Sequence, residues 1–274
     1  MTGPNPFFLE GTAGPLFCLH YPAPQPARHG VLVLPPFAEE MNKCRRMLGL
    51  TARAMQGAGL DVLLVDLFGT GDSAGDFSGA SLDVWRDDLR RAVGWLAERG
   101  TARLDLLAVR GGALLLQDFE LPVGMKRGRI VLWQPVVSGK LLIAQFLRLR
   151  AAEGMADTDR GRAAPDTRSS LQAGGSIEVA GYEIGRSLVS QLVDIADPLA
   201  DAANWQGLSW LEVVAEGVAE PGPSAQRVLD ALRQRGARVT AVVVPGDPFW
   251  ATPEIAVVPR LVDATVGALV EPGA

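Results

Sequence analysis

The sequence predicts an α/β fold with a mostly parallel central sheet of about eight strands and helices on both faces. Short apolar runs rich in β-branched residues alternate with longer segments of helical periodicity, a pattern typical of doubly wound α/β proteins. The runs are almost continuously apolar, as expected for strands that are buried on both faces of a parallel sheet. They are Gly30–Leu34, Asp61–Val65, Asp105–Ala108, Ile130–Trp133, Ser209–Val214 and Val239–Val244.

Helices are predicted between these runs because apolar residues recur there at spacings of three and four. Ser81 is a suitable N-cap for one of these helices, and Asp83 falls in its first turn. The apolar stripes are Cys44, Met47, Leu48, Thr51 and Met55; Trp85, Leu89, Ala92, Val93 and Leu96; and Val228, Leu229 and Leu232.

The alternation breaks between about residues 138 and 206, where the chain is rich in Arg, Asp, Gly and Ala. A structureless segment of this length is unusual within a compact domain. We therefore expect a single domain over residues 1–274, with an insertion at about 138–206 that carries helices of its own and covers one edge of the sheet as a small cap.

Composition excludes several classes of protein. The 274 residues carry a net charge of −5, which argues against a nucleic-acid partner. No apolar run is long enough for an integral membrane segment, and no signal peptide is visible at the N-terminus. The two cysteines, Cys18 and Cys44, have no metal-binding or disulfide spacing, so we expect reduced thiols, a cytoplasmic location and no metal.

The turn Ala108–Gly112 follows a buried strand and precedes the predicted helix ALLLQDF. A strand, a tight turn with small residues and a helix are the context of the G-x-S-x-G nucleophile elbow. Here the central residue is Arg110, which stays protonated and cannot accept an acyl group as a nucleophile.

Two further segments follow predicted strands. Asp66–Ser73 matches the turn D-x-x-G-x-G-x-S, and neither a phosphate loop nor a dinucleotide fingerprint is present, so no cofactor is expected. Ser73 is interpreted as a turn hydroxyl. The third segment reads PPFAEEMNKCRRM, from Pro35 onward, and occupies the place of the loop that supplies an oxyanion-hole amide beside the elbow.

Taken together, these segments resemble one family over nearly the whole chain. They are PPFAEEMNKCRRM, DLFGTGDSAGDF, AVRGGALL, EVAGYEI and PGDPFWATPEI. The family is that of the exosortase A system-associated hydrolases of the second type, encoded near exopolysaccharide and PEP-CTERM sorting genes. The resemblance implies an α/β-hydrolase fold with a small cap, and acyl or ester chemistry.

The histidines do not fit that chemistry. A triad histidine follows the last strand, where this chain has Pro245–Trp250, and the only histidines are His20 and His29. Both are expected at the surface or at a strand edge. The sequence therefore excludes a Ser-His-Asp mechanism.

Charged residues crowd the predicted cleft instead. Lys43, Arg45 and Arg46 stand near one helix start and Arg110 at another, although helix starts favour anions. Either Glu39 or Glu40 is expected to pair with Arg110, or an anionic ligand compensates it. Cys44 is interpreted as a core residue. The residues expected to contact a ligand are Phe37, Asn42, Arg45, Trp133 and Trp250. For Trp133 and Trp250 the alternative is packing between sheet and cap, and the pocket is favoured for Trp250.

Two classes of function remain open. In the first, Arg110 binds and polarises an anionic or carbonyl substrate while Glu39 or Glu40 transfers protons. In the second, the chain is a pseudo-hydrolase that binds an acyl, ester or saccharide ligand, or a protein partner. The fold alone does not choose between them, and the oligomeric state is left open.

Overall fold

A computed structural model of the chain describes residues 3–25, 28–158 and 176–270. Its central sheet has eight strands in the order β1-β2-β4-β3-β5-β6-β9-β10. The β1–β2 and β2–β4 pairs are antiparallel and the remaining pairs are parallel, which confirms the predicted fold class. The strands are β1 (Asn5–Glu10), β2 (Pro15–Tyr21), β3 (His29–Leu34), β4 (Asp61–Val65), β5 (Arg103–Val109), β6 (Lys126–Trp133), β9 (Gly207–Val214) and β10 (Val239–Pro245).

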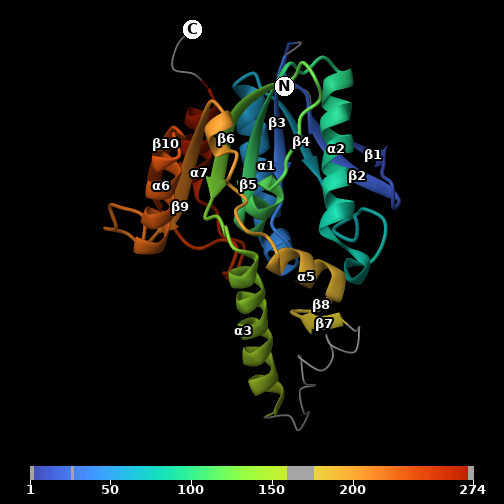
Figure 1. The fold of residues 1–274 in the computed structure, drawn as a ribbon, viewed down its shortest axis with the longest axis vertical. Helices are drawn as coiled ribbons and strands as arrows, with labels where there is room; N and C mark the ends of the chain where they lie inside the picture. The colour runs from blue at the N-terminus through green and yellow to red at the C-terminus, as the bar shows by residue number, and fades with distance from the viewer. Residues whose placement is uncertain (1–2, 26–27, 159–175, 271–274) are drawn as a thin grey trace.

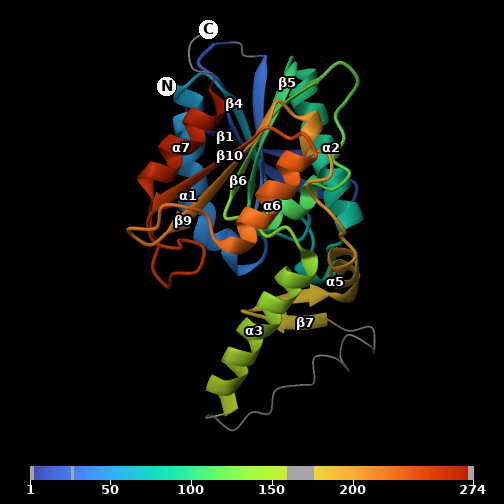
Figure 2. The ribbon, with the colours of Figure 1, turned by 60° about the vertical axis from the view of Figure 1, so that its left-hand side comes forward.

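Helices cover both faces of the sheet, as Figures 1 and 2 show. Alternate residues of β3 divide the core: Leu32 and Leu34 pack on one face, and Val31 and Val33 on the other. The first face is covered by α2 (Leu82–Glu98), the 3₁₀ helices η1 (Phe77–Gly79) and η2 (Arg110–Leu116), and α6 (Pro223–Gln234). The second is covered by α1 (Glu39–Gly57) and α7 (Pro259–Leu269).

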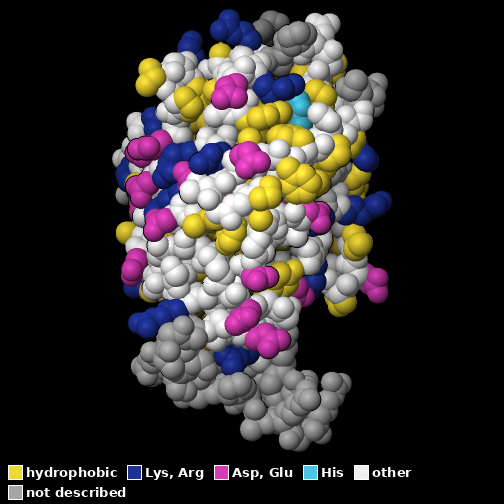
Figure 3. Space-filling model, turned by 90° about the vertical axis from the view of Figure 1, so that its right-hand side faces the viewer, with side chains coloured by type: hydrophobic (Ala, Val, Ile, Leu, Met, Phe, Trp, Pro, Cys, Tyr) yellow, Lys and Arg dark blue, Asp and Glu magenta, His cyan; other side chains and the backbone are white. Residues whose placement is uncertain are grey.

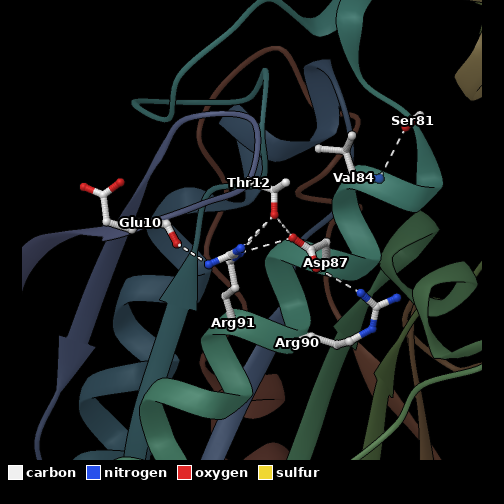
Figure 4. Close-up of polar contacts among 7 residues, drawn as sticks. All are labelled: Glu10, Thr12, Ser81, Val84, Asp87, Arg90 and Arg91. Carbon is white, nitrogen blue, oxygen red and sulfur yellow. Dashed lines mark hydrogen bonds and ion pairs between the residues drawn. The ribbon is translucent and has the colours of Figure 1, made fainter.

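Helix α2 has the N-cap expected from its sequence. Ser81 accepts a hydrogen bond from the Val84 amide at 3.3 Å. Further along the helix, Arg91 donates to the carbonyl of Glu10 and to Thr12, and thereby ties α2 to the turn between β1 and β2 (Figure 4). The apolar stripe predicted for this helix is buried throughout.

The segment between β6 and β9 projects from the end of the sheet to which the parallel strands run (Figures 1 and 2). It contains α3 (Gly139–Thr158), the antiparallel hairpin β7 (Ser176–Val179) and β8 (Tyr182–Gly185), α5 (Arg186–Val193) and η3 (Ala202–Asn204). The part of the expected insertion at 159–175 lies outside the described residues. The rings of Tyr182 and Phe77 are 5.7 Å apart, so the hairpin contacts η1.

The expectation that both histidines lie at the surface or a strand edge is wrong for His20, which is only 2% exposed. The reason is that β1 pairs with the outer side of β2, which makes β2 an interior strand. The His20 ring bonds to Asp61 at 2.8 Å, and the half-buried ring of His29 bonds to Asp105 at 2.6 Å. His29 begins β3, at the opposite end of the sheet from Arg110.

Within the described residues, no helix has both the length and the apolar composition needed to cross a bilayer.

Candidate functional site

Arg110 occupies the sharp turn between β5 and η2, with a φ angle of 52°. A side chain larger than glycine rarely adopts this conformation, and residues held there cluster at functional sites. The backbone therefore has the strained turn of a nucleophile elbow, with a cation in place of a nucleophile. The segment that follows is a seven-residue 3₁₀ helix, which corrects the expectation of an α-helix opening at this point.

The Arg110 guanidinium is held by three neighbours. Its Nε and Nη2 atoms donate to the same oxygen of Glu40, Oε1, at 3.0 and 2.8 Å. Nη1 donates to the carbonyl of Gln134 at 3.1 Å, and Nη2 reaches Oε1 of Gln145 at 3.4 Å. The ring of Trp250 lies 5.1 Å from the guanidinium carbon, within the range of a cation–π contact.

Glu40 is therefore the carboxylate that pairs with Arg110. The two side chains are 11% and 18% exposed, so the pair is largely buried. Burial raises the pKa of Glu40 above its ordinary value, even though the charge and hydrogen bonds of Arg110 lower it. Its second oxygen, Oε2, is buried and has no hydrogen-bond partner among the described residues. The guanidinium of Arg110 therefore has hydrogen-bond partners, whereas the buried oxygen Oε2 of Glu40 has none among the described residues.

Glu39, the other carboxylate considered from the sequence, forms an ion pair with Lys43 at 2.6 Å. Helix α1 begins at Glu39, so Glu39, Glu40 and Asn42 belong to the helix and only Phe37 and Ala38 remain in the loop before it. Ala38 has a φ of 52°, a second strained position beside the elbow. The helix therefore begins within the segment PPFAEEMNKCRRM, which was expected to occupy the place of the oxyanion-hole loop.

Asn42 and Arg45 contact different parts of the molecule. Asn42 donates from Nδ2 to the hydroxyl of Tyr182 at 2.6 Å, which connects α1 to the inserted hairpin. Arg45 pairs with Asp66 at 3.0 Å, and the Asp72 amide donates to the same Asp66 oxygen. Asn42 therefore lies where the insert meets α1, whereas Arg45 connects α1 to the turn after β4.

Trp133 and Phe37, which were expected to contact a ligand, both have their side chains in the core. Trp133 is 1% exposed and donates from Nε1 to Thr265 at 2.8 Å. Phe37 is 2% exposed, and its ring centroid is 4.7 Å from that of Trp85. Of the predicted aromatic residues, only Trp250 contacts the Arg110–Glu40 pair.

Neither Ser73 nor Cys44 supplies a nucleophile at this position. Ser73 accepts from the Phe17 amide at 2.8 Å and donates to the Asp66 carbonyl, as expected of a turn hydroxyl. Cys44 is fully buried, and burial raises its pKa, so its thiol stays protonated. Among the described residues there is also no group of three His, Cys, Asp or Glu side chains suited to a metal ion.

Gln134 and Gln145 are site residues that the sequence reasoning missed. Gln134 directly follows β6, has a φ of 40°, and accepts the Val213 amide on its side chain at 2.9 Å. Its position at a strand end, beside the elbow strand, was a usable signal, because ligand sites of α/β sheets lie at the carboxyl ends of strands. Gln145 lies in the insert, where the sequence offers no comparable marker.

The sheet order, the elbow turn and the insert after β6 define the α/β-hydrolase fold. No protein-family model matches the sequence, and no curated protein matches it.

Solved α/β hydrolases share this fold at low sequence identity. A serine hydrolase without a lid from Xanthomonas campestris is 20% identical, with a TM-score of 0.53 over 98% of this chain and 93% of that one. Est1E from Butyrivibrio proteoclasticus, solved with ferulic acid, is 13% identical, with a TM-score of 0.59 over 95% and 96%. A lipase/esterase from Lactobacillus plantarum is 13% identical, with a TM-score of 0.58 over 98% and 100%.

Proposed function

We propose that this chain binds an acyl, ester or saccharide ligand next to its elbow and does not hydrolyse it by a Ser-His-Asp mechanism. The observation that carries this proposal is the Arg110–Glu40 pair, which stands where a serine hydrolase has its nucleophile. A largely buried ion pair with this geometry fills the reactive position and neutralises itself.

The residues after β10 support the same proposal. In a serine hydrolase the loop after the last strand carries the histidine that acts as general base. Here the loop carries Phe249 and Trp250, whose rings pack edge to face at 5.1 Å, and Trp250 lies over Arg110. An aromatic ring cannot accept the proton that a serine must lose.

The ligand class rests on the resemblance to exosortase A system-associated hydrolases, which suggests an intermediate of an exopolysaccharide or PEP-CTERM pathway in the cytoplasm. Polar groups border the site, namely Asn42 and the Tyr182 hydroxyl, which are hydrogen-bonded to each other. In this proposal the segment between β6 and β9 is a cap over the site.

The purified protein is expected to show no labelling by a fluorophosphonate probe and no turnover of short-chain p-nitrophenyl esters. The reason is that neither an activated serine nor a histidine base lies at the elbow. Labelling of any serine, located by peptide mass spectrometry, together with turnover lost when that serine is replaced, would refute the proposal.

A second candidate function is an enzyme in which Arg110 polarises the substrate and Glu40 transfers the proton. The raised pKa of Glu40 and its unpartnered oxygen favour it, because general bases are tuned in this way. If turnover of an acyl or glycosyl compound is found, Glu40→Gln is expected to lower kcat by about a hundredfold or more. Glu39→Gln is the matched control, since Glu39 pairs with Lys43, and it should retain kcat.

A further inference from the structure

A cavity of about 230 Å³ lies between α1 and strands β2, β3 and β4, away from the Arg110–Glu40 pair. Most of its lining is apolar, and an apolar cavity of about 150 Å³ already holds a molecule the size of benzene. The lining consists of Phe17, Leu19, Tyr21, Val33, Pro35, Met41, Arg45, Leu48, Gly49, Leu64, Val65 and Asp66.

The cavity is long and narrow. Its α1 residues run from Met41 to Gly49, eight residues apart, which corresponds to roughly 12 Å along a helix. The facing residues of β2 run from Phe17 to Tyr21 on one side of the strand. Figure 3, which looks at the molecule from the side of β1 and β2, shows hydrophobic side chains over much of that surface. This shape suits a linear chain better than a ring system.

At one end of the cavity, the charged side chains of the lining pair with each other. Arg45 and Asp66 form an ion pair with each other, and Asp66 also accepts the Asp72 amide. These are the charged residues of the lining, and they leave no charge to be compensated by a ligand.

The other end holds a polar group that lacks a partner. Tyr21 is 2% exposed, and no described residue makes a hydrogen bond with its hydroxyl. The hydroxyl oxygen is not itself fully buried, and Tyr21 lines the cavity, so the hydroxyl is free to donate to a ligand there. Burial raises the pKa of Tyr21, which keeps the phenol protonated and able to donate.

Arg53 places a cation about one helical turn beyond Gly49, the residue that faces that hydroxyl. Arg53 is exposed on α1, and its charge lowers the pKa of Tyr21 against the larger effect of burial. Arg53 forms no ion pair with any described residue. It follows Gly49 by four residues, so the two share one face of the helix.

Gly49 keeps this end open. A glycine inside a helix costs stability relative to alanine, and here close packing does not require it. A Cβ atom built at Gly49 would meet a single neighbour, the Tyr21 hydroxyl at 3.7 Å, which is an ordinary contact distance. The absence of a side chain at residue 49 therefore leaves space in front of the tyrosine hydroxyl.

We propose that this cavity binds a medium-chain fatty acid, with the carboxylate between Tyr21 and Arg53 and the alkyl chain running along α1 toward Met41. The hydroxyl donates to the carboxylate, the guanidinium compensates its charge, and the apolar lining holds the chain. This site is separate from the elbow and does not depend on the function proposed there.

Isothermal titration with sodium decanoate, below its micelle concentration, tests the proposal, with decan-1-ol as the uncharged comparison. Decanoate is expected to bind saturably, and about tenfold more tightly than the alcohol. Gly49→Leu fills the cavity and should weaken decanoate by more than about tenfold, whereas the matched Gly49→Ala should stay within about threefold. If Gly49→Leu lowers the Tm strongly, Leu19→Trp fills the same space from β2.

Two further variants test the position proposed for the carboxylate of decanoate. Arg53→Gln should weaken decanoate by about tenfold and leave decan-1-ol unchanged, whereas Tyr21→Phe should weaken decanoate by about tenfold and decan-1-ol by less. Arg46→Gln is the matched control, because it removes the same charge from an exposed residue of α1 whose charge, unlike that of Arg53, does not act on the pKa of Tyr21. Three results would each overturn the proposal: no saturable binding to the parent protein, full binding to both cavity-filling variants, or equal losses in Arg46→Gln and Arg53→Gln.

Discussion

Replacing Arg110 with serine is expected to lower the free energy of unfolding by about 3 kcal/mol at pH 8 and to create no hydrolase. Removing one member of a buried ion pair leaves an uncompensated charge, at a typical cost of roughly 3–5 kcal/mol. The pair is 11% and 18% exposed, which places the expected loss at the lower end of that range. The new serine would lack a base, because Trp250 stands where the histidine would be.

The loss should depend on pH in a defined direction. Burial raises the pKa of Glu40 above 4.5 and Arg110 opposes this rise, so the pKa rises further in Arg110→Ser. A carboxyl group with a raised pKa in the folded state contributes stability below its unfolded pKa and loses it as the pH rises through its folded pKa. The deficit of Arg110→Ser is therefore largest above the folded pKa of Glu40 and shrinks as the pH falls toward 4.5.

Two controls separate this effect from a general loss of packing. The double variant Arg110→Ser/Glu40→Gln removes the stranded charge and should recover more than half of the loss. Arg45→Ser breaks an arginine–aspartate pair whose arginine is 42% exposed, so it should cost less than about 1 kcal/mol. Urea unfolding between pH 4.5 and pH 8 measures all of them. A deficit that does not change with pH would mean that Glu40 is not the charge left behind.

The sheet was predictable because its signal is local. The inner parallel strands are largely buried on both faces and are therefore nearly continuous apolar runs, as in β4 (Asp61–Val65). The hairpin of β1 and β2 was not assigned by residue. In β1 the positions are half-buried or exposed and none is buried. The run from Pro15 contains polar residues whose burial depends on the neighbouring strands.

Only those site residues could be predicted whose place follows from the order of strands and turns along the chain. The elbow position identifies Arg110, and the adjacent strand end places Glu40 within reach of it, as found. The sequence did not choose between Glu39 and Glu40, because that choice depends on which side of α1 faces the elbow. Trp133 and Phe37 were expected in the pocket because they follow strands, yet their side chains point into the core layers on either face of the sheet.

Gly112→Ala is expected to destabilise the protein by about 3 kcal/mol or more, because η2 passes directly against the end of β3. A Cβ atom at residue 112 would lie 2.3 Å from the carbonyl oxygen of Leu34 and 2.7 Å from that of Pro35. Both are backbone atoms, so the turn itself has to move, and overpacking of this kind costs roughly 1–3 kcal/mol or more.

Gly111→Ala is the matched control for this prediction. Its new Cβ would meet only side-chain atoms of Phe37 and Leu142, at 3.1 Å, and those can shift by a few tenths of an ångström. Urea unfolding should therefore show a much smaller loss for Gly111→Ala than for Gly112→Ala, and equal losses would contradict the argument. Moving the turn also moves Arg110 away from Glu40, so Gly112→Ala should weaken the stabilising effect of that pair. A double-mutant cycle of Gly112→Ala with Glu40→Gln measures this coupling, which we expect to be at least about 1 kcal/mol.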